Sequence, residues 1–122
     1  MRKQVLKSTE TTAALSSENW GNLRWLANQE IGNADRLTLG RVLVRKGKSN
    51  PRHCHPNCEE VLYLLSGRLE HTVGSKTVIL DPGDTLSIPA GVYHNALNIG
   101  DEDADMIVAY SCGTRDFQLE SA

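Results

Sequence analysis

The chain has 122 residues, of which 39% are hydrophobic and 23% charged, and its formal net charge is −2. These values are ordinary for one globular domain, and the scattered lysines and arginines exclude the clustered basic face of a nucleic-acid-binding protein. No apolar run approaches the roughly 20 residues of a membrane-spanning helix, and residues 1–10 lack the hydrophobic stretch of a signal peptide.

The first part of the chain, residues 1–22, is polar and irregular. We expect it to form an N-terminal arm, with one short strand near Gln4–Lys7 and one helical turn at Ser16–Trp20. Trp20 lies near the end of this arm and Trp25 just after it, and aromatic side chains of this kind are enriched at protein interfaces.

From Leu23 onward the signals are those of β-strands, namely short apolar or alternating runs separated by Gly and Pro turns. Gly74-Ser75 between two runs is typical of a tight hairpin. The spacing leaves no room for crossover helices, so we predict an all-β sandwich or barrel at residues 23–117 and a tail at 118–122. The expected strands are 23–27, 37–46, 61–65, 69–73, 76–80, 85–88, 92–98 and 105–111.

Four residues in this β region have the chemistry of a metal site. His53 and His55 are two residues apart where a strand should begin, so their side chains point to one side and Cys54 to the other. Glu60 opens the next apolar run, and His94 follows a proline–glycine turn. Three imidazoles and one carboxylate suit iron, nickel, manganese, cobalt, copper or zinc, so we predict one divalent metal ion here.

These residues also resemble the two sequence motifs of the cupin family. Gly47, five residues, His53-Cys54-His55, four residues, Glu60, six residues and Gly67 fit the first motif, whereas Gly83, five residues, Pro89-Ala90-Gly91, two residues, His94, three residues and Asn98 fit the second. The resemblance covers roughly residues 20–117. It implies a jelly-roll barrel, the four metal ligands His53, His55, Glu60 and His94, and a dimer.

The cysteines leave alternatives open. Cys54, His55 and Cys58 could form a structural zinc site, although alternation turns Cys54 away from the histidines. Cys54 and Cys58 otherwise pack as small buried side chains. Cys112 could be a catalytic thiol if its strand turns inward, but no base partner is identifiable. Because three cysteines make an odd number, we expect reduced thiols and a cytoplasmic location.

Two neighbouring positions bear on the ligand set. Glu59 would replace Glu60 as the metal ligand if the strand were shifted by one residue. Leu62 stands where the cupins that cleave dimethylsulfoniopropionate place a base tyrosine, so the sequence departs from that group. Tyr63 and Tyr93 lie at odd spacings from the ligands and should face away from the metal.

The expected substrate pocket is formed by residues that share strand faces with the ligands, namely Leu62, Ile88 and Ala96. Arg41 or Arg45 could reach into it and bind a substrate carboxylate as a fork. His71 shares a face with apolar residues. It is either a buried structural histidine or an acid–base group beside the pocket.

The outer face of the region predicts oligomerisation. Val61, Tyr63 and Leu65 lie opposite Glu60 and Leu62, so this strand is apolar on both faces. A strand of that kind is covered on both sides, and in a short chain the second cover is another subunit. We therefore predict a homodimer.

A site with four protein ligands leaves about two open positions on an octahedral ion, as catalytic metal centres do. Its net positive charge suits small chelating anions such as hydroxy acids, keto acids, diketones or uronates. Two hypotheses follow: a metal-dependent dioxygenase, lyase or isomerase, with His71 as the candidate acid or base, or a non-catalytic cupin that binds or senses a small ligand or carbohydrate. We expect a small-molecule ligand and no nucleic-acid or membrane partner.

Overall fold

The structure is a computed structural model that describes residues 5–9 and 14–121. The strands are β1 (Leu15–Glu18), β2 (Gly21–Ala27), β3 (Thr38–Val44), β4 (His53–Cys54), β5 (Glu60–Ser66), β6 (Leu69–Val73), β7 (Lys76–Leu80), β8 (Thr85–Ile88), β9 (His94–Asn98), β10 (Ala104–Tyr110) and β11 (Gln118–Leu119). They form two antiparallel sheets, with the orders β1-β2-β3-β10-β5-β8 and β11-β4-β9-β6-β7.

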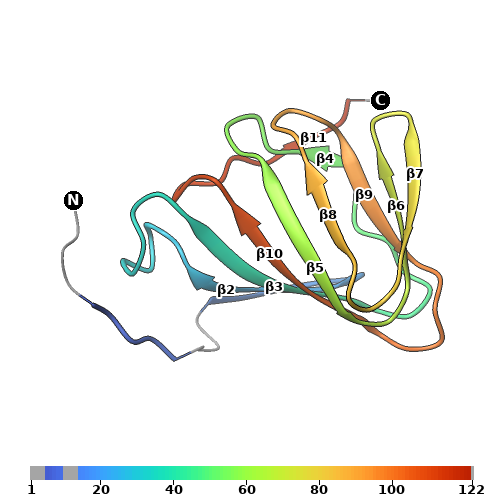
Figure 1. Cartoon of the computed structure of the whole chain (residues 1–122), viewed down its shortest axis with the longest axis horizontal. Coiled ribbons are helices and arrows are strands. Elements are labelled where there is room, and N and C mark those ends of the chain that lie inside the picture. The colour runs from blue at the N-terminus through green and yellow to red at the C-terminus, as the bar shows by residue number, and fades with distance from the viewer. Residues whose placement is uncertain (1–4, 10–13, 122) are drawn as a thin grey trace.

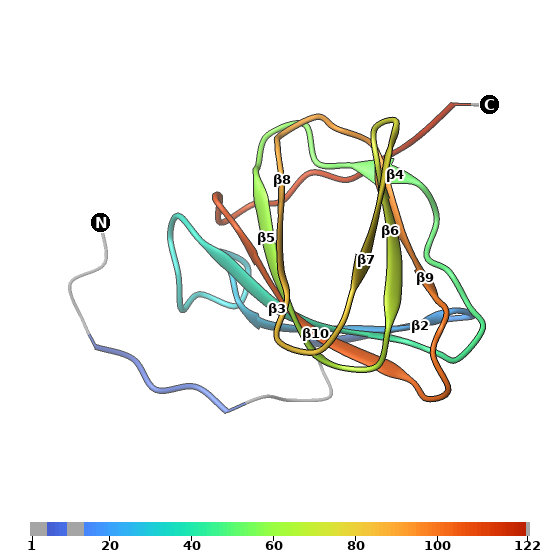
Figure 2. The same cartoon turned by 45° about the vertical axis from the view of Figure 1, so that its right-hand side comes forward.

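The two sheets face each other, as Figures 1 and 2 show. This is the expected all-β jelly-roll arrangement, but the two sheets are not closed into a barrel. Among the described strands, β8 pairs with β5 and β7 pairs with β6, and no hydrogen-bonded ladder joins β7 to β8. The turn that connects these two strands thus passes from one sheet to the other.

Alternation of side chains fixes which residues enter the space between the sheets. In β5 the even-numbered residues Glu60, Leu62 and Leu64 are buried, and the odd-numbered residues between them are exposed. In β10 the side chains of Met106, Val108 and Tyr110 are buried in the same way. The hydrophobic core is therefore built from one face of each sheet. Its buried members are Val42, Val44, Cys58, Leu62, Leu64, Leu69, Leu80, Ile88, Ala96, Ala104, Met106, Val108 and Tyr110.

Gly67 makes the sharp reversal between β5 and β6 possible. Its φ of +92° lies in the region that favours glycine, and a Cβ atom there would lie 2.6 Å from the Cα atom of Ala104. The chain thereby passes from the six-stranded sheet to the five-stranded sheet and carries β6, with His71, to the opposite side of the interior.

The N-terminal part differs from expectation. Gln4, the start of the first expected strand, lies outside the described residues, and Val5–Lys7 forms no strand. The helical turn expected at Ser16–Trp20 is wrong, because Leu15–Glu18 pairs with β2 as a strand. Pairing with β2 satisfies the backbone groups that a lone helical turn would leave open. The six-stranded sheet thus begins inside the expected arm.

No helical segment among the described residues has the length and hydropathy needed to cross a lipid bilayer.

Candidate metal centre

Three histidines, from β4, from the loop directly after it and from β9, meet between the sheets. His53 belongs to β4 and is the direct antiparallel partner of His94 in β9, so the ladder places these two imidazoles side by side. His55 follows two residues after His53 on the same side of the chain. The three rings offer ring nitrogens that all lie within 4.8 Å of one another, and all three residues are buried.

Each imidazole is held by a backbone carbonyl through Nδ1. The Nδ1 atoms of His53, His55 and His94 lie 2.6 Å from the Pro51 oxygen, 2.8 Å from the Asp116 oxygen and 2.9 Å from the Val92 oxygen, respectively. A carbonyl oxygen only accepts hydrogen bonds, so Nδ1 carries the proton and Nε2 of a neutral ring presents a lone pair. This is the arrangement that orients metal-binding histidines.

Glu60 completes the cluster from the start of β5. Its Oε1 atom lies 3.4 Å from Nε2 of His55 and 3.2 Å from Nε2 of His94. Both Glu60 Oε1 and His55 Nε2 are buried without a hydrogen-bond partner in the described part of the chain. Buried polar atoms without a partner are rare, and here they are acceptors that converge. A cation between them would satisfy all of these acceptors, so the residues present fit a divalent metal ion.

The electrostatics of the cluster keep the metal-binding forms populated. Burial lowers the pKa of His53 to about 4, so that its imidazole is neutral near pH 7. Burial raises the pKa of Glu60, but interactions with His55 and His94 outweigh this and bring it to about 2. Glu60 is therefore a carboxylate. Glu59 is exposed, which excludes it as the alternative to Glu60.

His71 faces the same interior from β6, opposite Ala96 of β9. It is only 2% exposed, and its Nδ1 atom has no hydrogen-bond partner among the residues described. Burial lowers its pKa to about 4, so the ring is neutral near pH 7. His71 thus combines burial with an unpaired ring nitrogen near the cluster.

A cavity of about 660 Å³ opens onto the cluster, and His53, Glu60, His71 and His94 are part of its wall. Its remaining wall comes largely from β2, β3, β10 and the segment after β10. The cavity is far larger than a metal ion needs, and its volume lies in the range of pockets that bind whole small molecules.

The expected pocket residues need correction. Leu62, Ile88 and Ala96 do face inward, but they are at most 2% exposed, belong to the core and are absent from the cavity wall. Arg41 lies on the opposite, exposed face of β3, where Nε and Nη2 donate to Asp105 at 2.9 and 2.6 Å. The assignment of Arg41 to the pocket is therefore wrong. The sequence left the phase of this strand ambiguous, and the structure buries Val42 and Val44 instead.

Several residues of the wall were missed by the sequence analysis, namely Trp25, Tyr110, Arg115 and Phe117. Phe117 stacks on His53 with ring centroids 4.8 Å apart, and Tyr110 meets His55 edge-on at 4.8 Å. Tyr110 had a signal in the sequence, since it continues the inward-facing alternation of β10. Arg115 and Phe117 follow the last long strand, where no periodic pattern predicts direction.

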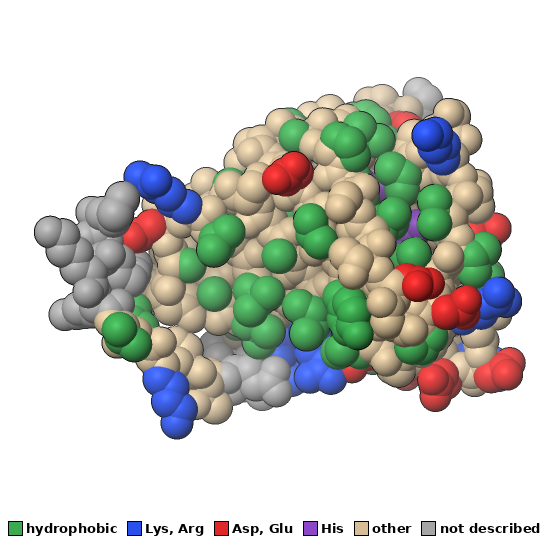
Figure 3. Space-filling model, viewed as in Figure 1, with side chains coloured by type: hydrophobic (Ala, Val, Ile, Leu, Met, Phe, Trp, Pro, Cys, Tyr) green, Lys and Arg blue, Asp and Glu red, His purple; other side chains and the backbone are tan. Residues whose placement is uncertain are grey.

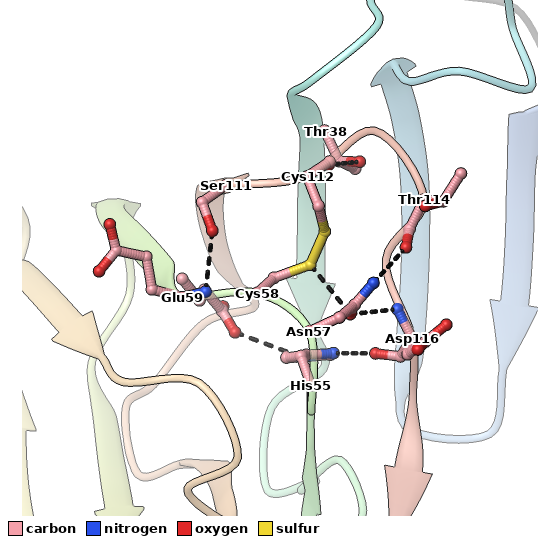
Figure 4. Close-up of a disulfide and its surroundings, with 10 residues drawn as sticks. Thr38, His55, Asn57, Cys58, Glu59, Ser111, Cys112, Thr114 and Asp116 are labelled. Atoms are coloured by element: carbon pink, nitrogen blue, oxygen red, sulfur yellow. Dashed lines mark hydrogen bonds and ion pairs between the residues drawn. A yellow bond between two sulfur atoms is a disulfide. The ribbon is translucent and has the colours of Figure 1, made fainter.

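Cys58 and Cys112 form a disulfide, shown in Figure 4. This corrects the expectation of reduced cysteines, because the odd cysteine, Cys54, is buried and separate from the bond. It also excludes the zinc site of Cys54, His55 and Cys58 and the catalytic thiol at Cys112. The bond joins the loop between His55 and Glu60 to the segment that follows β10.

Comparison with known protein families agrees with this two-sheet fold. The family model described as "Cupin domain" matches residues 40–110, and the chain belongs to the cupin family.

Curated relatives cover several activities. The chain is 34% identical over 87 residues to polyketide synthase CurC of Streptomyces cyaneus, covering 71% of this chain and 56% of the relative. It is 31% identical over 80 residues to germin-like protein 3-8 of rice, covering 62% of this chain and 36% of that protein. Oxalate oxidase GF-2.8 of Triticum aestivum is 29% identical over 95 residues, with 71% and 41% covered. The matches thus span only about a third to just over half of these relatives.

Solved structures agree with the fold. A Bacillus subtilis oxalate decarboxylase variant superposes with a TM-score of 0.80 at 22% identity, covering 86% of this chain and 29% of that one. An oxalate oxidase gives a TM-score of 0.77 at 23% identity, covering 85% of this chain and 57% of the other. At these identities the likeness concerns the fold alone.

Proposed function

We propose that this protein is a small metal-dependent cupin enzyme that acts on a small chelating anionic metabolite, in a reaction of the dioxygenase, lyase or isomerase type. The observation that carries the proposal is the convergence of His53, His55, Glu60 and His94, in which Glu60 Oε1 and His55 Nε2 are buried without a hydrogen-bond partner among the described residues. These four side chains would hold the ion, and a site with four protein ligands would leave room on it for a small molecule.

The bound ion would supply Lewis-acid or redox chemistry to the substrate. The residues of the chain orient the metal ligands and move a proton. The carbonyls of Pro51, Val92 and Asp116 hold the three imidazoles in place. His71, neutral and with an unpaired Nδ1 in the cavity wall, is the group proposed to accept or return a proton at the substrate.

Manganese is the first metal to test among iron, nickel, manganese, zinc, cobalt and copper. One superposed oxalate decarboxylase is described by its Mn(II) centres. The relatives named as oxalate oxidases and as a polyketide synthase support small-molecule chemistry, because their names concern organic acids or polyketides. Geometry and availability select the metal more than raw affinity does.

The alternative, a cupin that binds or senses a small ligand or carbohydrate without catalysis, would be favoured by an apolar pocket without titratable groups beyond the metal ligands. The cavity wall contains His71, Tyr110 and Arg115 in addition to the ligands. This composition favours the enzyme.

The decisive test is metal analysis of wild type and His55→Ala after incubation with Mn²⁺, Fe²⁺ or Zn²⁺ and desalting. We expect about one ion per wild-type chain and at least a 100-fold loss of affinity in the variant, since even the loss of a residue that only hydrogen-bonds to a metal ligand costs roughly 10- to 100-fold. His71→Gln is the matched control and should retain the ion. Equal metal content in His55→Ala and wild type would refute the ligand set. If wild type does bind one ion, oxygen uptake by its iron-loaded form would identify a dioxygenase.

We also propose that the protein is a homodimer through the outer face of the six-stranded sheet. Val61, Tyr63 and Leu65 of β5 are 39–44% exposed, and Ala109 and Ile107 of β10 lie next to Val61 and Tyr63 in the sheet. Figure 3 shows hydrophobic side chains gathered on this side. Light scattering at micromolar concentration should give twice the chain mass, and a monomer mass would contradict the proposal.

Cytoplasmic location stays a prediction, but the argument from reduced cysteines no longer supports it, because Cys58 and Cys112 are bonded. The disulfide content of the protein isolated from its own cells would test it, since a fully reduced chain favours a reducing compartment and a fully oxidised chain an oxidising one.

A further inference from the structure

The segment between β10 and β11, residues 111–117, carries one arginine. It lies against the loop between β4 and β5, residues 55–59, which contains the metal-ligand candidate His55. Figure 4 shows its attachments. The amide of Asn57 donates to the Thr114 oxygen at 2.7 Å, and the Asp116 nitrogen donates to the Asn57 side-chain oxygen at 2.9 Å. With the His55–Asp116 hydrogen bond and the disulfide at Cys112, these contacts fix the backbone on both sides of Arg115.

Three aromatic rings surround the guanidinium of Arg115. Its Cζ atom lies 4.6 Å from the ring centroid of Trp25, 5.3 Å from that of Tyr110 and 5.6 Å from that of Phe117. Such positions are favourable for a cation. The Trp25 ring is itself held over Gly40, since a Cβ atom at that glycine would lie 2.7 Å from two ring carbons. The charge is thus held in place without a carboxylate.

The same rings link Arg115 to the metal cluster. Tyr110 lies near the guanidinium and also contacts the imidazole of His55, and Phe117 lies near the guanidinium and also stacks on the imidazole of His53. Arg115 also lines the cavity onto which the cluster opens. The guanidinium is therefore one aromatic ring away from the ligands and lines the same cavity.

Arg115 has unused hydrogen-bonding capacity. Its Nε atom is buried and has no hydrogen-bond partner in residues 5–9 and 14–121, and none of the ion pairs found there involves Arg115. An arginine fork donates to both oxygens of a carboxylate, and a charge-assisted bond of that kind is stronger away from water. The guanidinium interacts with the Tyr110 side chain, but its Nε donor stays open to an anionic group that enters the cavity.

We infer that Arg115 is the specificity-determining residue of this site and binds a carboxylate of the ligand beside the metal centre. Leu23, Val42 and Met106, which form an apolar part of the cavity wall, contact the ligand's hydrocarbon body. The inference rests on the proposed function for the metal, but the carboxylate contact itself needs only the cavity. A space of about 660 Å³ accommodates acids much larger than oxalate.

Binding constants of matched acids and amides test the inference. Mandelate, phenylpyruvate and 3-phenylpropionate, each paired with its primary amide, are titrated calorimetrically into wild type, with and without Mn²⁺. We expect the carboxylates to bind more tightly than the amides. In Arg115→Met, which keeps the packing volume, the carboxylate affinity should fall about 10- to 100-fold while amide affinity stays the same.

Two further variants keep the result interpretable. Arg115→Lys retains the charge without the fork and should recover part of the preference. Arg41→Met removes an arginine from the outer face and should change neither affinity. The inference is overturned if no acid binds wild type more tightly than its amide, or if the preference survives in Arg115→Met. An Arg115-dependent preference in a wild type that binds no metal would leave the inference standing and refute the proposed function instead.

Discussion

Buried polar residues stand at both ends of β9, and they differ in one respect. Asn98 is 3% exposed, and its amide donates to the oxygens of Val44 and Glu102 at 2.9 Å while its oxygen accepts from the Gly100 nitrogen. His94, on the same face, is equally buried, yet its Nε2 atom points at another acceptor, Glu60 Oε1. At the end of β9 near Asn98, which we call the core end, the polar groups have hydrogen-bond partners within the protein. At the end near His94, which we call the site end, polar groups stay open for a ligand.

This difference separates structural from functional polar residues without reference to relatives. A polar side chain that stabilises the fold has partners for its donors and acceptors. A polar side chain that binds a ligand keeps at least one group open, at a cost in stability. The variants below measure that difference, in order of the expected change in unfolding free energy.

The largest effect is expected from the disulfide that closes the site end. Replacing Cys58 and Cys112 by alanine should lower the free energy of unfolding by up to about 4 kcal/mol, because the bond spans 54 residues of chain. Urea unfolding of the metal-free protein measures this. Cys54→Ala, which removes a buried sulfur but no cross-link, is the matched control. A loss no greater than in Cys54→Ala would show that the site end holds without the bond.

The next effect concerns the core end. Asn98→Leu removes three hydrogen bonds, two to the oxygens of Val44 and Glu102 and one from the Gly100 nitrogen, so we expect a loss of about 2–4 kcal/mol in unfolding free energy. Metal stoichiometry should remain that of wild type after refolding at low temperature. If Asn98→Leu keeps its stability but loses metal binding, Asn98 acts in the metal site and does not mainly stabilise the core.

The pH dependence of stability sharpens the comparison at His71. Burial lowers its pKa from 6.5 to about 4 in the folded state, so the unfolded chain binds the proton more readily between these values. The stability that comes from burying neutral His71 should therefore be complete above pH 6.5, and the free energy of unfolding should fall as the pH drops toward 4. Chemical unfolding of metal-free wild type and His71→Gln at pH 4.5 to 7.5 should show a shallower slope in the variant. If the slope is the same in the variant, the titration of His71 does not cause the pH dependence of stability.

The smallest change in stability is expected for Glu60→Gln. The amide keeps the shape of the carboxylate and can donate to the unpaired Nε2 of His55, so Glu60→Gln should cost less metal-free stability than Asn98→Leu does. Metal affinity should nevertheless fall more than about 10-fold, because the anionic ligand is lost. Competition with a chromogenic chelator measures the affinity. A large loss of stability without loss of affinity would make Glu60 a structural residue.

The side-chain directions that could be predicted from the sequence were those fixed by strand alternation. Alternation with a period of two residues was enough to group the four expected metal ligands, His53, His55, Glu60 and His94. The same reasoning failed at Arg41, since three consecutive apolar residues, 42–44, hide the phase of β3. Cys58 and Cys112 could not be paired from sequence, because nothing local brings together residues 54 positions apart.

Arg115 and Phe117 mark the other limit. They belong to a segment without strand periodicity, whose path is set by hydrogen bonds to Asn57 and His55. Side-chain direction in such a segment follows from tertiary contacts alone. The metal cluster was therefore predictable, whereas the residues expected to choose the ligand were not.

The cross-link between Cys58 and Cys112 has a consequence for damaged molecules. Peptide-bond cleavage at any one point between these residues yields two polypeptides that remain covalently attached. Glu60, His71 and His94 lie inside that circle of chain, and His53 and His55 lie before it. A protease-nicked molecule therefore migrates as one species on a gel until a thiol reagent releases its fragments, and it keeps both halves of the cluster tethered in the meantime.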